Sequence, residues 1–191
     1  MILGFKKNKD SHWFSNAILN DTFDWAKSFK TTFEIFLKYV SLHDSYFVII
    51  KYNATNEIII SIELDAYWNS KYTLKTREIK DWPYLIIKIQ NVFNISLNSL
   101  THETIIDDAS TENISKNEID RLIGPLTDSM LFPQDFYNRI IDCKEIVKTR
   151  FEDILGGNIE FLHEPDIYVL LIEKNGCYID PNIDRLNPIR R

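Results

Sequence analysis

The sequence predicts an α+β protein with a mainly antiparallel sheet, formed by two hairpin groups and about four helices. Short β-rich segments pair across turns within residues 45–64 and again within 158–180. Segments with helical spacing of apolar residues lie between these groups, without the regular strand–helix alternation of a parallel sheet. We expect a single domain over residues 1–191, with a boundary near 101–114 as the alternative.

The first elements are short. Residues 20–25 can begin a short helix, and Thr32 can cap a second helix that runs to about Leu42. The apolar residues of this second helix share one face: Phe33, Phe36, Leu37 and Val40. The β-rich runs 45–52 and 57–64 follow, joined by a four-residue turn, and they predict a hairpin.

The middle of the chain is predicted to be mainly helical. After a third strand at residues 72–79, the sequence Asp81-Trp82-Pro83 begins a helix. The apolar residues at helical spacing in this helix are Leu85, Ile86, Ile89, Val92 and Phe93. A capping box at Ser115 and Glu118 begins a short helix that ends at Gly124-Pro125.

The longest helix is predicted from Pro133 to Leu155, ended by Gly156-Gly157. The positions that form its apolar stripe are Phe136, Tyr137, Ile140, Ile141, Val147, Phe151, Ile154 and Leu155. Strands are predicted after it at residues 158–163, 167–173 and 177–180. Asn175-Gly176 lies between the last two strands and is a strong hairpin signal, because both residues tolerate a positive φ.

The charge of the chain is acidic and unevenly placed. The formal net charge is −6, and residues 101–128 hold seven acidic and two basic residues, which gives −5. A pI near 5.2 argues against non-specific nucleic-acid binding, which depends on Lys and Arg neutralising phosphates. The acidic segment has two interpretations: a solvated loop and helix face, or a docking patch for a basic partner.

No targeting or membrane segment is predicted. The longest apolar runs, residues 46–50 and 167–172, are far shorter than the ~20 residues of a membrane span. No apolar stretch of signal-peptide length follows the first residues, so we expect a cytoplasmic protein. For Cys143 and Cys177 a reduced pair is favoured over the alternative, a disulfide.

The usual catalytic and cofactor motifs do not occur in the sequence. The four histidines, His12, His43, His102 and His163, have no zinc-site spacing, so no metal site is predicted. No glycine-rich phosphate loop and no G-x-S-x-G motif is present, so no cofactor is expected. Cys143 falls within the predicted long helix and Cys177 at a predicted hairpin, and no catalytic residue is predicted.

One pattern resembles that of an enzyme. Asp65, followed thirteen residues later by Glu78-Ile79-Lys80, is similar to the PD-(D/E)xK motif of metal-dependent nucleases, although Leu64 stands where that motif has proline. The alternative interpretation is a solvated strand edge. Pro165-Asp166 with Glu173-Lys174 is a weaker match, because it lacks the spacer residue.

The aromatic pair Tyr67-Trp68 follows a predicted strand in a segment that reads as a loop. Trp and Tyr are enriched at the energetic centres of protein interfaces. The two rings are therefore candidate partner contacts. The alternative is that both rings fold back onto the core.

In type, the chain resembles the immunity proteins with which bacteria guard themselves against polymorphic or contact-dependent toxins. The resemblance rests on the acidic segment and on Tyr67-Trp68, and the 29 Ile against five Ala and five Gly are typical of an AT-rich, bacterial genome. It implies a cytoplasmic inhibitor whose partner is a cognate toxin of basic, nuclease type. The expected contact residues are Asp107, Asp108, Glu112, Tyr67 and Trp68. The alternative function is the metal-dependent nuclease with Asp65, Glu78 and Lys80.

Overall fold

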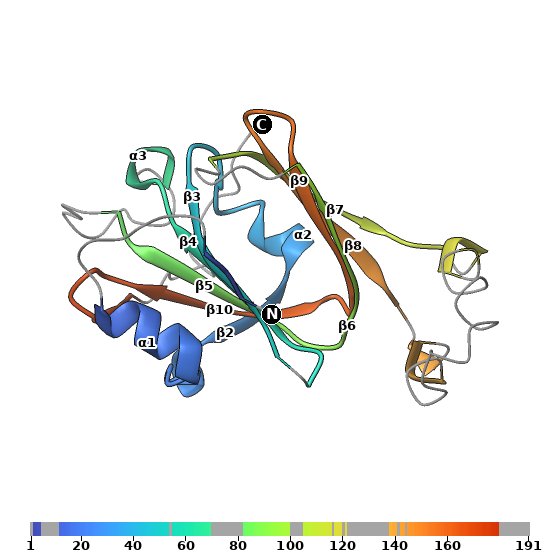
Figure 1. Ribbon diagram of the computed structural model, residues 1–191, viewed down its shortest axis with the longest axis horizontal. Helices are drawn as coiled ribbons and strands as arrows, with labels where there is room; N and C mark the ends of the chain where they lie inside the picture. Colours follow the sequence, from blue (N-terminus) through green and yellow to red (C-terminus); the bar gives the residue numbers. More distant parts are fainter. Residues whose placement is uncertain are drawn as a thin grey trace.

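The structure is a computed structural model. It describes residues 2–4, 12–53, 55–69, 82–99, 105–115, 117–119, 121, 138–140, 142–143 and 145–179. Within these residues, antiparallel strands form two sheets accompanied by short helices (Figure 1). The predicted α+β class with mainly antiparallel pairing is therefore confirmed. The predicted strand over residues 72–79 lies outside the described residues.

The larger sheet, sheet A, contains both predicted hairpins. Its strand order is β1-β3-β4-β5-β10-β11, and β2 pairs with β10 as well. The strands are β1 (Ile2–Gly4), β2 (Phe29–Thr32), β3 (Tyr46–Tyr52), β4 (Ile58–Glu63), β5 (Tyr84–Ile89), β10 (Asp166–Ile172) and β11 (Tyr178–Ile179). The pairings β3–β4 and β10–β11 confirm the hairpins that the sequence predicts near residues 45–64 and at Asn175-Gly176.

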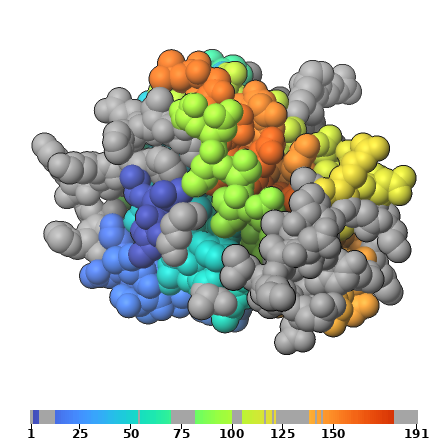
Figure 2. Space-filling view, turned by 45° about the vertical axis from the view of Figure 1, so that its right-hand side comes forward, coloured from blue at the N-terminus to red at the C-terminus, as the bar shows by residue number. Residues whose placement is uncertain are grey.

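The smaller sheet, sheet B, has the order β6-β9-β8-β7. Its strands are β6 (Val92–Asn98), β7 (Ile106–Asn113), β8 (Val147–Asp153) and β9 (Asn158–His163). In Figure 2, β6 crosses the visible face in yellow-green, beside the orange of its neighbour β9. Strand β9 was predicted correctly, but β10, which follows it along the chain, belongs to the other sheet.

The predicted helix over residues 81–95 is wrong. These residues form β5 and β6, separated by a turn in which Asn91 has φ +52°. Strand β5 is a central strand covered on both faces, so its residues are apolar at nearly every position. Such a run contains helical spacing by coincidence. Its short length and its β-branched residues were the signals that favoured a strand.

The predicted long helix from Pro133 to Leu155 is also wrong beyond residue 142. Helix is present at residues 138–140 and 142, whereas Val147–Asp153 is strand β8. In β8 the side chains alternate strictly between inside and outside, with Lys148, Arg150 and Glu152 on the outer side. This alternation is the period of a strand and not of a helix. The residues before 138 lie outside the described part of the chain.

Gly156-Gly157 therefore forms a hairpin turn between β8 and β9 and not a helix end. Gly156 has φ +83°, and the Asp153 carboxylate accepts hydrogen bonds from the backbone N–H groups of Leu155 (2.9 Å) and Gly157 (2.7 Å). A Cβ atom on Gly157 would lie 2.7 Å from the Ser99 carbonyl oxygen. Gly157 is thus required by a close approach of two backbone segments.

We expect Gly157→Ala to lower the free energy of unfolding by about 1–3 kcal/mol, because a methyl group there must displace backbone atoms. Urea denaturation monitored by circular dichroism measures this difference. Gly4→Ala is the matched control, because a Cβ atom on Gly4 would meet nothing within 4 Å. An equally small effect of both substitutions would contradict the prediction.

Two helix starts were predicted correctly, at Thr32 and at Ser115, whereas the predicted end of the second helix at Gly124-Pro125 lies outside the described residues. Thr32 caps α2, since its side-chain oxygen accepts a hydrogen bond from the backbone N–H of Ile35 at 3.3 Å. Helix α2 spans only Phe33–Phe36, yet its predicted apolar face is buried as expected, at Phe33, Phe36, Leu37 and Val40. The capping box is confirmed by reciprocal hydrogen bonds between Ser115 and Glu118.

The main core lies between the two sheets, and α2 is placed there (Figure 1). The rings of Phe33 from α2, Phe47 from sheet A and Phe161 from sheet B surround Phe151 at centroid distances of 5.4 to 6.1 Å. One cluster of buried residues thus includes side chains of both sheets. Each sheet buries a face against the other, which is the arrangement expected of packed layers.

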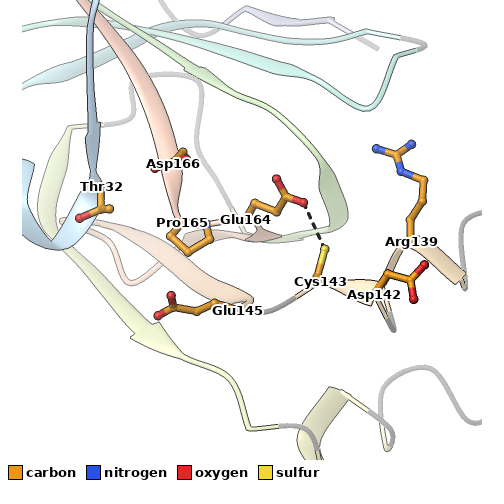
Figure 3. A pocket seen from close by; sticks show the side chains of 8 residues that line it. All are labelled: Thr32, Arg139, Asp142, Cys143, Glu145, Glu164, Pro165 and Asp166. Carbon is orange, nitrogen blue, oxygen red and sulfur yellow. Dashed lines mark hydrogen bonds between the residues drawn. The ribbon is translucent and has the colours of Figure 1, made fainter.

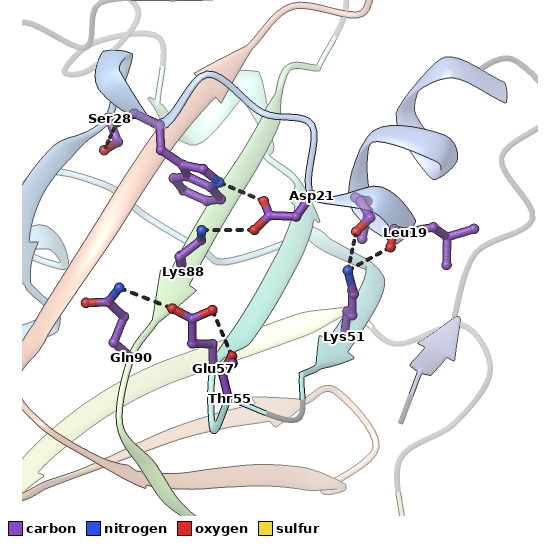
Figure 4. A network of polar contacts seen from close by, with 10 residues as sticks. Leu19, Asp21, Ser28, Lys51, Thr55, Glu57, Lys88 and Gln90 are labelled. Atoms are coloured by element: carbon purple, nitrogen blue, oxygen red, sulfur yellow. Dashed lines mark hydrogen bonds and ion pairs between the residues drawn. The ribbon is translucent and has the colours of Figure 1, made fainter.

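The outer face of sheet A is covered by α1 (His12–Asn20) and the short 3₁₀ helix Trp25–Lys27, so the short helix expected within residues 20–25 is replaced by this pair. In Figure 4, Lys88 of β5 forms an ion pair with Asp21 at 3.0 Å. Lys51 of β3 donates hydrogen bonds to the carbonyls of Ile18 (3.2 Å) and Leu19 (2.7 Å) at the end of α1. A cation at a helix C-terminus is favourable, so these lysines hold the helix on the sheet.

Candidate protein-binding surface

Tyr67 and Trp68 lie on a short helix and not in a loop as predicted. This helix is anchored to residues 41–45. Helix α3 spans Ala66–Asn69. The Asp65 carboxylate accepts a hydrogen bond from the backbone N–H of Trp68 at 2.9 Å, and the fully buried Asn69 side chain bonds both the N–H and the C=O of Ser41 at 2.9 Å. These contacts fix α3 against residues 41–45.

The two rings of α3 lie at the surface. Tyr67 is 78% exposed and Trp68 is 43% exposed, with their ring centroids 5.6 Å apart in an edge-to-face arrangement. The indole N–H of Trp68 donates a hydrogen bond to the Asp44 carboxylate at 2.8 Å, and its ring lies 5.2 Å from that of His43. The alternative that both rings fold back onto the core therefore does not hold.

His43 connects this aromatic pair to the acidic segment. Its Nδ1 atom lies 2.9 Å from the backbone carbonyl oxygen of Asp107 and 3.6 Å from the Asp107 carboxylate. Its Nε2 atom lies 3.6 Å from the Asp44 carboxylate. His43, Asp44, Tyr67, Trp68 and Asp107 therefore form one continuous surface, which we call the acidic-aromatic patch.

The acidic segment is only partly a member of this patch. Residues 106–113 are strand β7, an edge of sheet B, and not the loop that one interpretation expected. Asp108 is exposed on the outer face of that sheet, opposite Glu152. Glu112 forms an ion pair with Lys148 on the same face, five residues along the strand from Asp107. Of the three predicted acidic contact residues, Asp107 alone contacts the patch among the described residues.

No binding role was predicted for His43 or Asp44. His43 was considered only as one of four histidines without zinc-site spacing. Asp44 adopts φ +61°, and its backbone N–H donates a hydrogen bond to the carbonyl of Ile106 at 2.9 Å, which brings the 43–44 turn to β7. This contact joins segments more than sixty residues apart, so no local signal indicates it.

The nuclease pattern receives no support from the described residues. Asp65 is only 5% exposed, and its carboxylate is used as the helix cap of α3. Glu78 and Lys80 lie outside the described residues. In the weaker match, Asp166 pairs with Lys30 and Lys174 with Glu63, both at 2.6 Å. Asp166 is the first residue of β10 and Lys174 lies beyond its other end, so they do not converge.

A pocket of about 600 Å³ lies beside the turn between β9 and β10 (Figure 3). Its lining consists of Thr32, Arg139, Asp142, Cys143, Glu145, Glu164, Pro165 and Asp166. The thiol of Cys143 donates a hydrogen bond to the Glu164 carboxylate at 3.2 Å. Burial, together with this carboxylate, raises the pKa of Cys143 to about 12, so the thiol is neutral and a poor nucleophile.

Cys143 and Cys177 are both free cysteines in this structure. Among the described residues, no three His, Cys, Asp or Glu side chains are placed to hold a metal ion. The same part of the chain contains no helix with the length and apolarity needed to cross a membrane.

The fold and patch define an α+β protein of two packed antiparallel sheets with an exposed acidic and aromatic surface. Comparison of the chain with protein-family models, with curated proteins and with solved structures found no match.

Proposed function

We propose that this protein is an inhibitor that binds a basic, nuclease-type toxin and covers its phosphate-binding surface, in the manner of an immunity protein. The observation that carries the proposal is the contact of Trp68, Asp44, His43 and Asp107. Through this contact, two exposed rings and two exposed carboxylates share one face. The acidic-aromatic patch is the proposed contact surface.

The chemistry of the patch fits a lysine- or arginine-rich partner. The side chains of Asp44 and Asp107 are 47% and 55% exposed, so their carboxylates can accept hydrogen bonds from a partner's cations. Arginine also stacks on the faces of Tyr and Trp rings. A nuclease needs cations on its substrate-binding surface, and the net charge of −6 favours its encounter with this protein.

The patch is also held in place before a partner binds. Asp65 caps α3 and Asn69 attaches it to residues 41–45, so Tyr67 and Trp68 are not on a free loop. A surface that is already ordered loses less conformational entropy on association. This property supports a binding role for the two exposed rings.

The direct experiment is a pull-down of the tagged protein from its host, with the product of the neighbouring open reading frame co-expressed. We expect stoichiometric capture of a basic protein that is toxic when expressed alone and harmless when co-expressed. Capture of a neutral or acidic partner whose binding does not depend on salt would contradict the proposal.

We expect Tyr67→Ala and Trp68→Ala each to weaken binding to the captured toxin by about 30-fold, the effect of losing about 2 kcal/mol at an interface centre. Surface plasmon resonance measures this change. Leu155→Ala is the matched control, because Leu155 is 71% exposed but lies at the β8–β9 turn, outside the patch. Equal affinity of all three variants would remove the patch from the interface.

A further inference from the structure

We propose that the edge of sheet B along β7 accepts an extended, basic strand of the partner, which pairs with residues 107–113. This inference rests on the proposed function and names the binding mode. Main-chain hydrogen bonds to an exposed sheet edge are a general way of recognising an extended segment.

The backbone of β7 presents the groups that such pairing needs. The N–H of Ile114 donates to the carbonyl of Ile146 at 2.9 Å, so the backbone N–H and C=O groups of Ile114 point toward β8. The backbone N–H and C=O groups of successive residues in a strand point in alternating directions. The pairing of β7 with β8 from Asp108 to Asn113 has no register shift that would interrupt this alternation. The N–H and C=O groups of Ala109, Thr111 and Asn113 therefore point away from β8, where no described strand pairs with them. Ala109 is only 4% exposed, so the groups accessible to a partner are those of Thr111 and Asn113.

The start of this open edge coincides with the acidic-aromatic patch. Before it, the backbone of residues 44–46 covers the edge: Asp44 donates to Ile106, and Ile106 donates to the carbonyl of Ser45 at 2.8 Å. At Asp107 this cover ends, and the carbonyl there is contacted by the side chain of His43. A strand added along residues 107–113, about 20 Å at 3.4 Å per residue, would thus begin beside the rings of α3.

The side chains of β7 define the sequence of the added strand. On the outer face the residues are Asp108, Ser110 and Glu112, and on the inner face Ala109 and Thr111 lie toward the core. Asp108 has no ion-pair partner among the described residues. A partner strand with lysine or arginine at alternate positions would meet the carboxylates, and its apolar residues would extend the inner face.

The acidic charge of β7 disfavours pairing between two copies of this edge and distinguishes it from the opposite edge, β6. Two β7 edges of neighbouring copies would bring Asp108 and Glu112 against like charges, which disfavours self-pairing. The opposite edge of sheet B, β6, presents the uncharged side chains of Asn94, Ser96 and Asn98 on the same outer face. Of the two edges of this sheet, β7 is the one that selects a basic strand.

The probe for this edge is a capped peptide in which seven residues alternate between lysine and valine. We expect it to slow the hydrogen exchange of the backbone amides of Thr111 and Asn113 by about tenfold or more, measured by NMR, because each becomes a donor within a ladder. The same peptide with glutamate for lysine should have no effect. A lysine peptide N-methylated at each valine should also have none, because the valines lie opposite Thr111 and Asn113 and theirs are the N–H groups that face β7.

Asn113→Pro tests the edge from the protein side, because it removes one outward N–H at the end of the strand, where proline is tolerated. We expect it to bind the lysine peptide about fivefold more weakly than Asn113→Ala, which keeps that N–H. Equal binding of the two variants, or equal exchange protection by the glutamate or N-methylated peptide, would overturn the inference. The N-methylated peptide is tested on the unaltered protein and does not depend on the proline variant folding.

The two proposals fail separately. The peptide experiment uses no toxin, so a pull-down that captures nothing removes the inhibitor function but leaves the exchange result intact. If a basic toxin is captured and the amides of Thr111 and Asn113 exchange at the same rate in its complex as in the free protein, the inhibitor function stands and edge pairing is overturned.

Discussion

Phe151→Ala is expected to lower the free energy of unfolding by about 3–5 kcal/mol, the range for removing a fully buried aromatic ring. Phe151 has no exposed surface, and its ring contacts Phe33, Phe47 and Phe161, which belong to α2 and to both sheets. The cavity would therefore open at the junction of the layers, where neighbouring side chains are held by two different sheets and can collapse only partly.

Urea denaturation at neutral pH measures the effect of this substitution. Ile154→Ala is the matched control: Ile154 is 51% exposed in the turn that follows the same strand, so its loss should change the free energy by about 0.5 kcal/mol or less. A loss for Phe151→Ala as small as that of the control would show that the two sheets do not share the core described above.

The stability of the protein is expected to fall as the pH drops from about 6.5 to about 4, because of His163. The side chain of His163 is fully buried, and burial lowers its pKa from 6.5 to about 4. Its Nδ1 faces the carbonyl of Glu164, and its Nε2 lies 2.9 Å from the hydroxyl oxygen of Thr149. The neutral ring, with hydrogen on Nδ1, satisfies both contacts when Thr149 donates to Nε2.

The direction of the change in stability with pH follows from proton binding at His163. Between pH 6.5 and 4 the unfolded state binds a proton at His163 and the folded state does not, so acid favours unfolding. The contribution is complete above pH 6.5 and is lost as the pH falls to 4. Its full size is about 3 kcal/mol, at a slope of up to about 1.4 kcal/mol per pH unit for one proton.

Urea denaturation at several pH values between 7.5 and 4 checks this expectation. His163→Gln keeps an acceptor and a donor in the side chain but cannot be protonated in this range, so its slope should be smaller than that of the unaltered protein by about one proton. Identical slopes for the two proteins would show that His163 does not titrate differently in the folded and unfolded states.

The elements that the sequence predicted correctly are those whose signals are local. The hairpin of β3 and β4 lies in two β-rich runs around a short turn, and Asn175-Gly176 supplies the positive φ of its own turn at Gly176. Thr32 and the box of Ser115 and Glu118 bond backbone groups within three residues. Each of these contacts is contained within a few consecutive residues, so a single sequence is enough to read it.

The wrong helices have a common physical cause. Strand β5 is covered on both faces, by α1 on one side and by sheet B on the other, so apolar residues fill nearly all its positions. The spacing of these residues therefore does not distinguish a strand from a helix. The alternation in β8 was present in the sequence, at Val147, Thr149, Phe151 and Asp153, but apolar residues further along also fitted a helical stripe. The pairing of β8 with β7 and β9 decides between the two patterns.

The sequence by itself determined the α+β class, the two hairpins of sheet A, the acidic segment, and the pair Tyr67-Trp68 as candidate contacts. The tertiary structure alone decided that Trp68 and Asp107 share one face, because Asp44 and His43 connect them across the chain. It also decided that β7 forms an edge, since strand order depends on which distant segments pair. Helix caps and turns depend on neighbouring residues, whereas this surface depends on contacts between segments far apart in the sequence.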